Sequence, residues 1–187
     1  VPFANLTPHD LVLSGSPRRL LVASLDTQLI HHLNPTTLDL ITTNSFPGVM
    51  EGKTLVSLSL AVGPNVSGSD QDLFVAYIEN SGTAANPDYK GSVPRMTSYG
   101  SDLVSELIDA SDPKLTAPLD IAFDNAGRVY VVDMSANAST YRVLRYTVGP
   151  TGKAVFDAEI IGPQSFAWGP NTGRVRIQFF NEPAAES

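Results

Sequence analysis

Residues 118–147 read PLDIAFDNAGRVYVVDMSANASTYRVLRYT, and they carry the clearest secondary-structure signal of the chain. Two short apolar runs, at 121–123 and 129–132, flank the turn residues Asp124-Asn125-Ala126-Gly127, and a third run begins at Tyr141. Short runs of β-branched and aromatic residues separated by turn residues are typical of strands, and Gly at the end of such a turn favours a hairpin. The stretch therefore predicts consecutive antiparallel strands.

The same order of residue types occurs near the start of the chain. Pro8, Asp10 and Arg19 match Pro118, Asp120 and Arg128, so both units read Pro-x-Asp-apolar-x-apolar, a polar turn, Arg and an apolar run. Two weaker copies follow. One contains residues 73–77 and has no clear equivalent of the aspartate; the other begins at residue 163, has Ser165 at the position of the aspartate and continues with a strand at 174–177. Repeats of this length are typical of propeller blades. They predict one all-β domain, 1–187, with four-stranded antiparallel blades at approximately 7–46, 54–110, 116–162 and, incomplete, 163–187.

The remaining strands follow from the same pattern. Residues 29–33 and 38–42 are expected to complete the first blade, and residues 103–108 favour a strand over a helix. Residues 80–93 are expected to form a rim loop. With about three and a half to four blades, three ways of closing the ring stay open. Residues 1–6 can complete the last blade, the chain can belong to a longer propeller, or other chains can supply the missing surface.

Residues 118–147 resemble an NHL-type blade of the lactonase- and lyase-like propeller superfamily. In that family an Asp commonly ends the second strand, and Asp133 lies at this position. Asn137 lies where the family has a polar loop, and Arg142 lies where the family has an arginine after that loop. The first unit has Ser24 at the position of Asp133. The resemblance implies a propeller fold, and it is shared by scaffolds, binding modules and enzymes, so it does not choose among these functions.

Composition excludes several classes of protein. The 187 residues carry a formal charge of −7 and a pI near 4.8, which argues against nucleic acid as a partner. The sequence contains no run of 18 or more uncharged apolar residues, so it predicts no membrane-spanning helix. The absence of cysteine excludes disulfides and thiolate chemistry.

Asp10 and Asp120 are the candidate metal ligands. They occupy equivalent positions on predicted inner strands, where carboxylates can face a central channel and hold a divalent cation. Resemblance to lactonase-like propellers implies Ca²⁺ as that cation, with Glu51 as a further candidate ligand. The favoured alternative is that each carboxylate accepts backbone hydrogen bonds from a neighbouring blade, with no cofactor.

Other polar and aromatic residues are candidates for binding. His9 is the histidine that a lyase-like channel would use, Asp133 follows from the family motif, and Trp168 either packs between blades or stacks on a sugar. Phe179 and Phe180 can form an interface seam at the incomplete blade. The chain has no nucleophile elbow and no His-Glu-x-x-His motif, so the sequence leans away from an enzyme.

Three sequons, at Asn5, Asn65 and Asn137, are candidate glycosylation sites of a secreted or cell-surface protein. The predicted function is an extracellular binding or assembly module without catalysis, with a protein or glycan ligand. One alternative is a propeller hydrolase or lyase that uses the channel carboxylates with a divalent cation. The other is a structural subunit that associates with itself through the incomplete blade.

Overall fold

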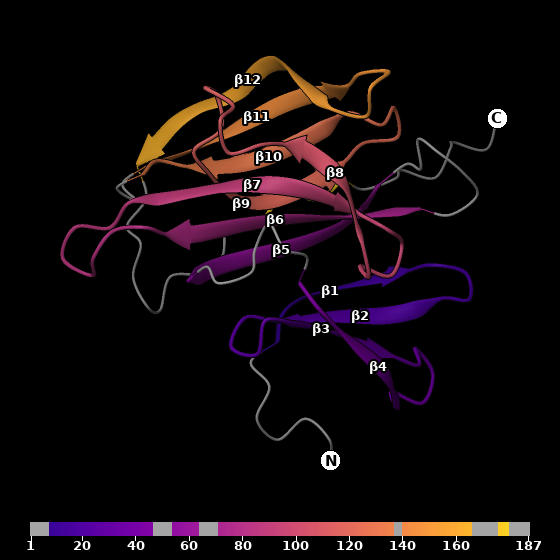
Figure 1. Cartoon of the computed structure of the whole chain (residues 1–187). Helices are drawn as coiled ribbons and strands as arrows, with labels where there is room; N and C mark the ends of the chain where they lie inside the picture. Colours follow the sequence, from indigo (N-terminus) through magenta and orange to yellow (C-terminus); the bar gives the residue numbers. More distant parts are fainter. Residues whose placement is uncertain (1–7, 47–53, 64–70, 137–139, 166–175, 180–187) are drawn as a thin grey trace.

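A computed structural model describes residues 8–46, 54–63, 71–136, 140–165 and 176–179. Within these ranges every regular element is a strand, and the twelve strands form three four-stranded antiparallel sheets (Figure 1). The strands of the first sheet are β1 (Pro8–Ser14), β2 (Arg19–Ser24), β3 (Leu29–Leu33) and β4 (Leu40–Ser45). Those of the second are β5 (Leu55–Gly63), β6 (Asp72–Asn80), β7 (Tyr89–Met96) and β8 (Leu103–Ile108). Those of the third are β9 (Ala117–Phe123), β10 (Val129–Met134), β11 (Thr140–Val148) and β12 (Ala154–Ser165).

Local hydrogen bonds explain why the hairpins form where the sequence predicts them. At the β9–β10 turn, the Asp124 carboxylate accepts the backbone N–H groups of Ala126 and Arg128, each at 2.9 Å. Gly127 has a φ of 75°, a left-handed conformation that glycine adopts without a Cβ clash. The polar turn of residues 124–127 therefore fixes the register of β9 against β10.

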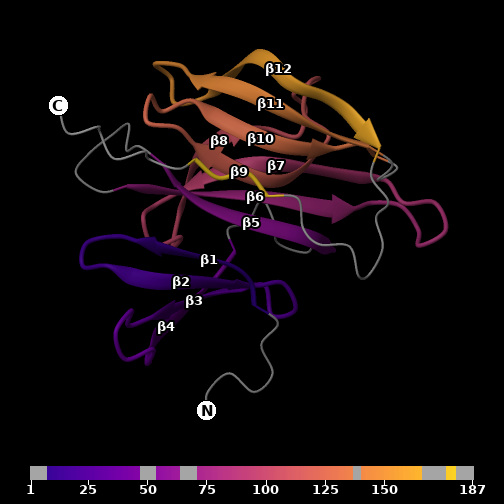
Figure 2. The same ribbon diagram turned by 180° about the vertical axis from the view of Figure 1, so that it is seen from behind.

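The three sheets stack face to face, with the first strand of each sheet near a common axis, as two opposite views show (Figure 1, Figure 2). We refer to the sheets as blades 1, 2 and 3 in chain order. One apolar cluster joins blades 1 and 2 through residues such as Ile30 and Val75, and another joins blades 2 and 3 through residues such as Phe74 and Val131. Strands β5 and β6 are buried on both faces, because blade 2 lies between blades 1 and 3.

The predicted all-β fold of four-stranded, propeller-type blades is confirmed. The described sheets do not close into a ring. In these parts of the chain no helix is long and apolar enough to cross a membrane.

Some boundaries differ from the prediction. The third blade extends to Ser165, because β12 pairs with β11 through Thr140, so the predicted boundary at residue 163 falls inside a strand. The rim loop of blade 2 is shorter than predicted, since β7 begins at Tyr89 and supplies the third strand of that blade. Glycine permits this pairing at Gly91, where a Cβ would lie 1.9 Å from the Tyr77 carbonyl oxygen.

Candidate functional site

Asp10, Ser59 and Asp120 occupy the same position on the three inner strands. They pair with Ala23, Ala76 and Val132, which are the corresponding residues of β2, β6 and β10. Sequence reasoning equated the two aspartates but found no equivalent in blade 2. The signal was present, because Ser59 is followed by the same apolar-x-apolar pattern as each aspartate.

Ser59 joins the two carboxyl groups. Its hydroxyl oxygen lies 2.9 Å from Oδ2 of Asp10 and 2.5 Å from Oδ1 of Asp120, and all three side chains are buried. A serine hydroxyl has one hydrogen to donate, so it cannot donate to both carboxyl groups at once. Both contacts are satisfied when one carboxyl group is protonated and donates to the serine oxygen.

Asp120 is the carboxyl group suited to hold that proton. Burial raises the pKa of Asp120. Hydrogen bonds from Ser59 and Ile177 and the charge of Arg176 lower this pKa, and the nearby Asp10 raises it further, with a net upward shift. Asp10 is surrounded by donors instead. It accepts from the N–H groups of Leu11 and Leu60 and from Nη1 of Arg176, at 2.8–2.9 Å. Both oxygens of Asp10 therefore act as acceptors.

These contacts do not fit a metal site. Ca²⁺ takes six to eight oxygen ligands, whereas both oxygens of Asp10 already accept hydrogen bonds and a guanidinium lies 2.8 Å away. In the described ranges no three acidic or histidine side chains gather as a metal-binding group. The predicted metal ligands Asp10 and Asp120 are thus brought together through Ser59 in a hydrogen-bonded cluster. Glu51 lies outside the described residues.

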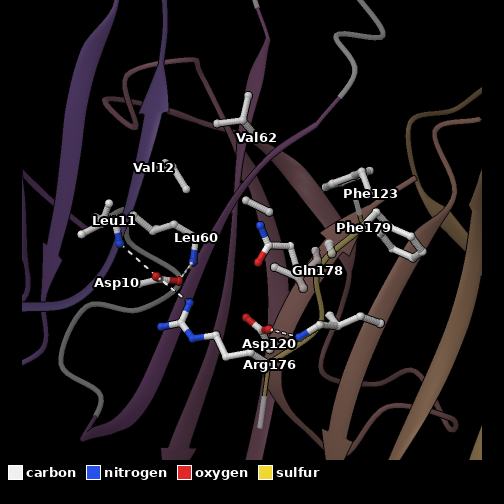
Figure 3. Close-up of a pocket in the computed structure, with 14 residues that line it drawn as sticks. Asp10, Leu11, Val12, Leu60, Val62, Asp120, Phe123, Arg176, Gln178 and Phe179 are labelled. Carbon is white, nitrogen blue, oxygen red and sulfur yellow. Dashed lines mark hydrogen bonds and ion pairs between the residues drawn. The ribbon is translucent and has the colours of Figure 1, made fainter. Parts of the chain in front are cut away.

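A cavity of about 480 Å³ lies along the axis beside this cluster (Figure 3). Its walls come from the three inner strands and from one non-strand segment near the end of the chain. Asp10, Asp120 and Arg176 lie close together at one end, and the Gln178 side chain lies between Leu60 and Phe123 in the view. The lining residues are 10–12, 60–62, 120–123 and 176–179.

Residues 176–179 hold the fourth position around this axis. The Ile177 N–H donates to Oδ2 of Asp120 at 2.6 Å, and the Phe179 ring packs on Tyr130 with 4.6 Å between centroids. The sequence had placed Ser165 at the position equivalent to Asp10 and Asp120. That assignment is wrong, because Ser165 belongs to β12 and Arg176 lies beside the inner-strand carboxylates. The segment also does not form the predicted strand at residue 176.

His9 and Asp133, both predicted to bind a ligand, contact the protein's own backbone. Nδ1 of His9 lies 2.7 Å from the Leu58 carbonyl oxygen, so this side chain bridges blades 1 and 2, and it does not line the axial cavity. Asp133 accepts the N–H groups of Thr116 and Ala117 at 2.9 and 2.8 Å. His9 thus links β1 to β5, and Asp133 holds the start of β9 in place.

The Asp133 carboxylate also pairs with the Arg142 guanidinium, whose Nη2 lies 3.0 Å away and donates to the Lys114 carbonyl oxygen as well. Burial raises the pKa of Asp133, and these donors oppose the shift. A cavity of about 290 Å³ lies beside the pair. Asp133 and Arg142 therefore meet as register partners of β10 and β11, nine positions apart in the sequence.

His31 and His32 lie on opposite faces of β3, as adjacent strand residues must. Both are buried, and burial lowers the pKa of each. The pKa of His32 falls to about 4, because the Arg19 charge adds to the effect of burial. The candidate residues Trp168, Asn5, Asn65 and Asn137, and also Phe180, lie outside the described residues.

No protein-family model matches the chain, and no curated protein matches it. Among solved structures, the chain is similar to hydrazine synthase of Kuenenia stuttgartiensis, with a TM-score of 0.52 and 11% sequence identity. The match covers 82% of this chain and 37% of that one, so the chain spans little more than a third of its neighbour. A likeness at this identity concerns the fold alone. The NHL resemblance stays a prediction.

Proposed function

We propose that this protein is a non-catalytic assembly module whose open propeller ring is completed by a further blade packed on blade 1. The observation that carries the proposal is the apolar outer face of that blade. Leu13, Leu20, Leu33 and Leu40 pair in register across β1 to β4 and form one row on this face. Leu13 is 46% exposed and Leu40 is 45% exposed, whereas Leu20 is half-buried and Leu33 is buried.

The opposite face of the same blade supports the choice of partner. There Leu21, Ala23 and Ile30 are fully buried against blade 2, a four-stranded antiparallel sheet. Leu13 and Leu40 leave exposed apolar surface at both ends of the leucine row, and exposed apolar surface of this kind suits a contact with another sheet. Leu11, which is 59% exposed, extends this surface toward the axis.

A catalytic function has less support. The hydrolase or lyase alternative needs channel carboxylates that are available to a cation or a substrate, and Asp10 is occupied by three donors from two other segments of the chain. His9, the proposed acid–base residue, contacts the backbone of blade 2. The site geometry therefore favours a structural cluster that holds the inner strands together.

The extracellular location and a protein or glycan ligand belong to the same proposal. They rest on the NHL resemblance and on the three sequons, at Asn5, Asn65 and Asn137. Mass spectrometry of protein from a secretory host tests the location, because occupied sequons add hexose-containing mass. Unmodified asparagine at all three positions would count against secretion.

The assembly proposal is tested by sedimentation of the wild-type chain and of a Leu13→Ser/Leu40→Ser variant. We expect the wild type to form a discrete multimer and the variant to be a folded monomer. Leu38→Ser is the matched control, because Leu38 is 53% exposed on the β3–β4 turn and lies outside the leucine row. A wild-type monomer at every accessible concentration would contradict association between copies of the chain.

A further inference from the structure

Four segments of the chain share one pattern around the axial cavity. In each, a polar residue is followed by an apolar residue, a variable residue and another apolar residue. The apolar residues are aliphatic in the first place and aliphatic or aromatic in the second. The four segments read Asp10-Leu11-Val12-Leu13, Ser59-Leu60-Ala61-Val62, Asp120-Ile121-Ala122-Phe123 and Arg176-Ile177-Gln178-Phe179.

The contact between successive segments also repeats. Oδ2 of Asp10 accepts the N–H of Leu60 at 2.8 Å, and Leu60 directly follows the polar residue of the next segment. Oδ2 of Asp120 accepts the N–H of Ile177 at 2.6 Å, and Ile177 directly follows Arg176. Residues 176–179 therefore contact β9 of blade 3 in the same way that β5 of blade 2 contacts β1 of blade 1.

The segment differs from an inner strand in what holds it. The described residues 176–179 have no strand pairing, whereas β1, β5 and β9 are each paired within a sheet. Three contacts keep the segment in place. The Arg176 guanidinium donates to Asp10, the Ile177 N–H donates to Asp120, and the Phe179 ring packs on Tyr130. The Ile177 side chain packs beside the cluster that contains Tyr130.

We propose that the space between β9 and β1 is a peptide-binding site for an extended segment of sequence Arg-aliphatic-x-aromatic. The chain fills this site with its own residues 176–179, and the same segment of a second copy can take their place. The Asp10 carboxyl group, which accepts from a guanidinium, selects arginine, Asp120 accepts a main-chain N–H, and Tyr130 receives the aromatic ring. Recognition by a main-chain hydrogen bond and alternate side chains is the ordinary mode by which an extended peptide is bound beside a strand.

The test uses a full-length variant, Arg176→Glu/Phe179→Ala, and a synthetic peptide with the sequence of residues 172–183, TGRVRIQFFNEP. The variant loses both side-chain contacts of the segment and places a negative charge near Asp10, so its own segment should leave the site. Circular dichroism first establishes that the variant keeps the β fold. Calorimetric titration then measures peptide binding to the variant and to the wild type.

We expect the peptide to bind the variant saturably and the wild type at least about tenfold more weakly, because the wild-type site is already filled. A peptide with alanine in place of Arg176 should bind the variant about tenfold more weakly, since a charge-assisted hydrogen bond is lost. Adding Asp10→Asn to the variant should remove this difference between the two peptides.

Two results would overturn the proposal. One is a folded variant that does not bind the peptide. The other is equal binding of the arginine and alanine peptides to the variant, which would show that the contact is apolar and unspecific. If the variant does not fold, Arg176→Ala replaces it as host, because this change removes the guanidinium contact of the chain's own segment and leaves Asp10, Asp120 and Tyr130 in place. The same two results then decide.

Discussion

Arg176 follows Asp10 by 166 residues, and its Nη1 donates to Oδ1 of Asp10 at 2.8 Å. The contact joins the last described segment of the chain to the first strand. Together with the Ser59 contacts it connects four segments around one axis. A buried polar cluster of this kind stabilises the fold only when each group is satisfied, so the protonation states of its carboxyl groups decide how substitutions act.

Asparagine should be tolerated at residue 120 and not at residue 10. Asp120→Asn places an amide that donates to Ser59 and accepts from Ile177, which matches a protonated carboxyl group. Asp10→Asn removes the charge that Arg176 faces and leaves one fewer acceptor for its donors, so we expect it to lower the free energy of unfolding by about 2–3 kcal/mol. Urea unfolding at neutral pH measures both. Equal losses would show that Asp120 is ionised.

The raised pKa of Asp120 predicts how stability depends on pH. The folded state keeps a proton on Asp120 above the pKa of an unfolded aspartate, near 3.9. The folded state then binds more protons than the unfolded state, so this residue stabilises the fold fully at low pH and less as pH rises through its folded pKa.

The comparison that isolates this effect is urea unfolding of the wild type and Asp120→Asn from pH 4 to 8. We expect the variant to gain stability relative to the wild type as pH rises. A constant difference between the two proteins across this range would contradict a raised pKa.

His32 should make the protein less stable in acid. Burial and the Arg19 charge lower the pKa of His32 to about 4, whereas an unfolded histidine titrates near 6.5. The unfolded state binds the proton first, so stability falls as pH drops from about 6.5 toward 4. A His32→Gln variant should lose this part of the pH dependence. An unchanged slope in the variant would assign the acid sensitivity to other groups.

Gly91→Ala should be strongly destabilising. An added Cβ would lie 1.9 Å from the Tyr77 carbonyl oxygen and 2.9 Å from Cδ of Pro118, and both neighbours are held in paired strands. We expect a loss of about 3 kcal/mol or more in thermal or urea unfolding. Gly149→Ala is the control, because its Cβ would lie no closer than 3.4 Å to another atom. Similar stabilities of the two variants would contradict the close approach at Gly91.

Local pattern was enough to predict most strands. β3 and β8 have the predicted bounds, because alternation and turn residues act over a few neighbours along the chain. The third strand of blade 2 was missed, since Gly91 and Pro94 reduce its apolar signal and its pairing with Tyr77 and Ile78 is a tertiary property. The start of the fourth unit was predicted too early, at residue 163, because the pairing of β12 with β11 as far as Ser165 is also a tertiary property.

The class of fold and the equivalence of Asp10 with Asp120 both follow from residue order within short repeats. Tertiary structure alone decided that Ser59 lies between these carboxyl groups and that Arg176 faces them. These contacts join residues separated by 49 to 166 positions in the chain. Such contacts depend on how whole blades stack, and no local pattern of residues encodes that geometry.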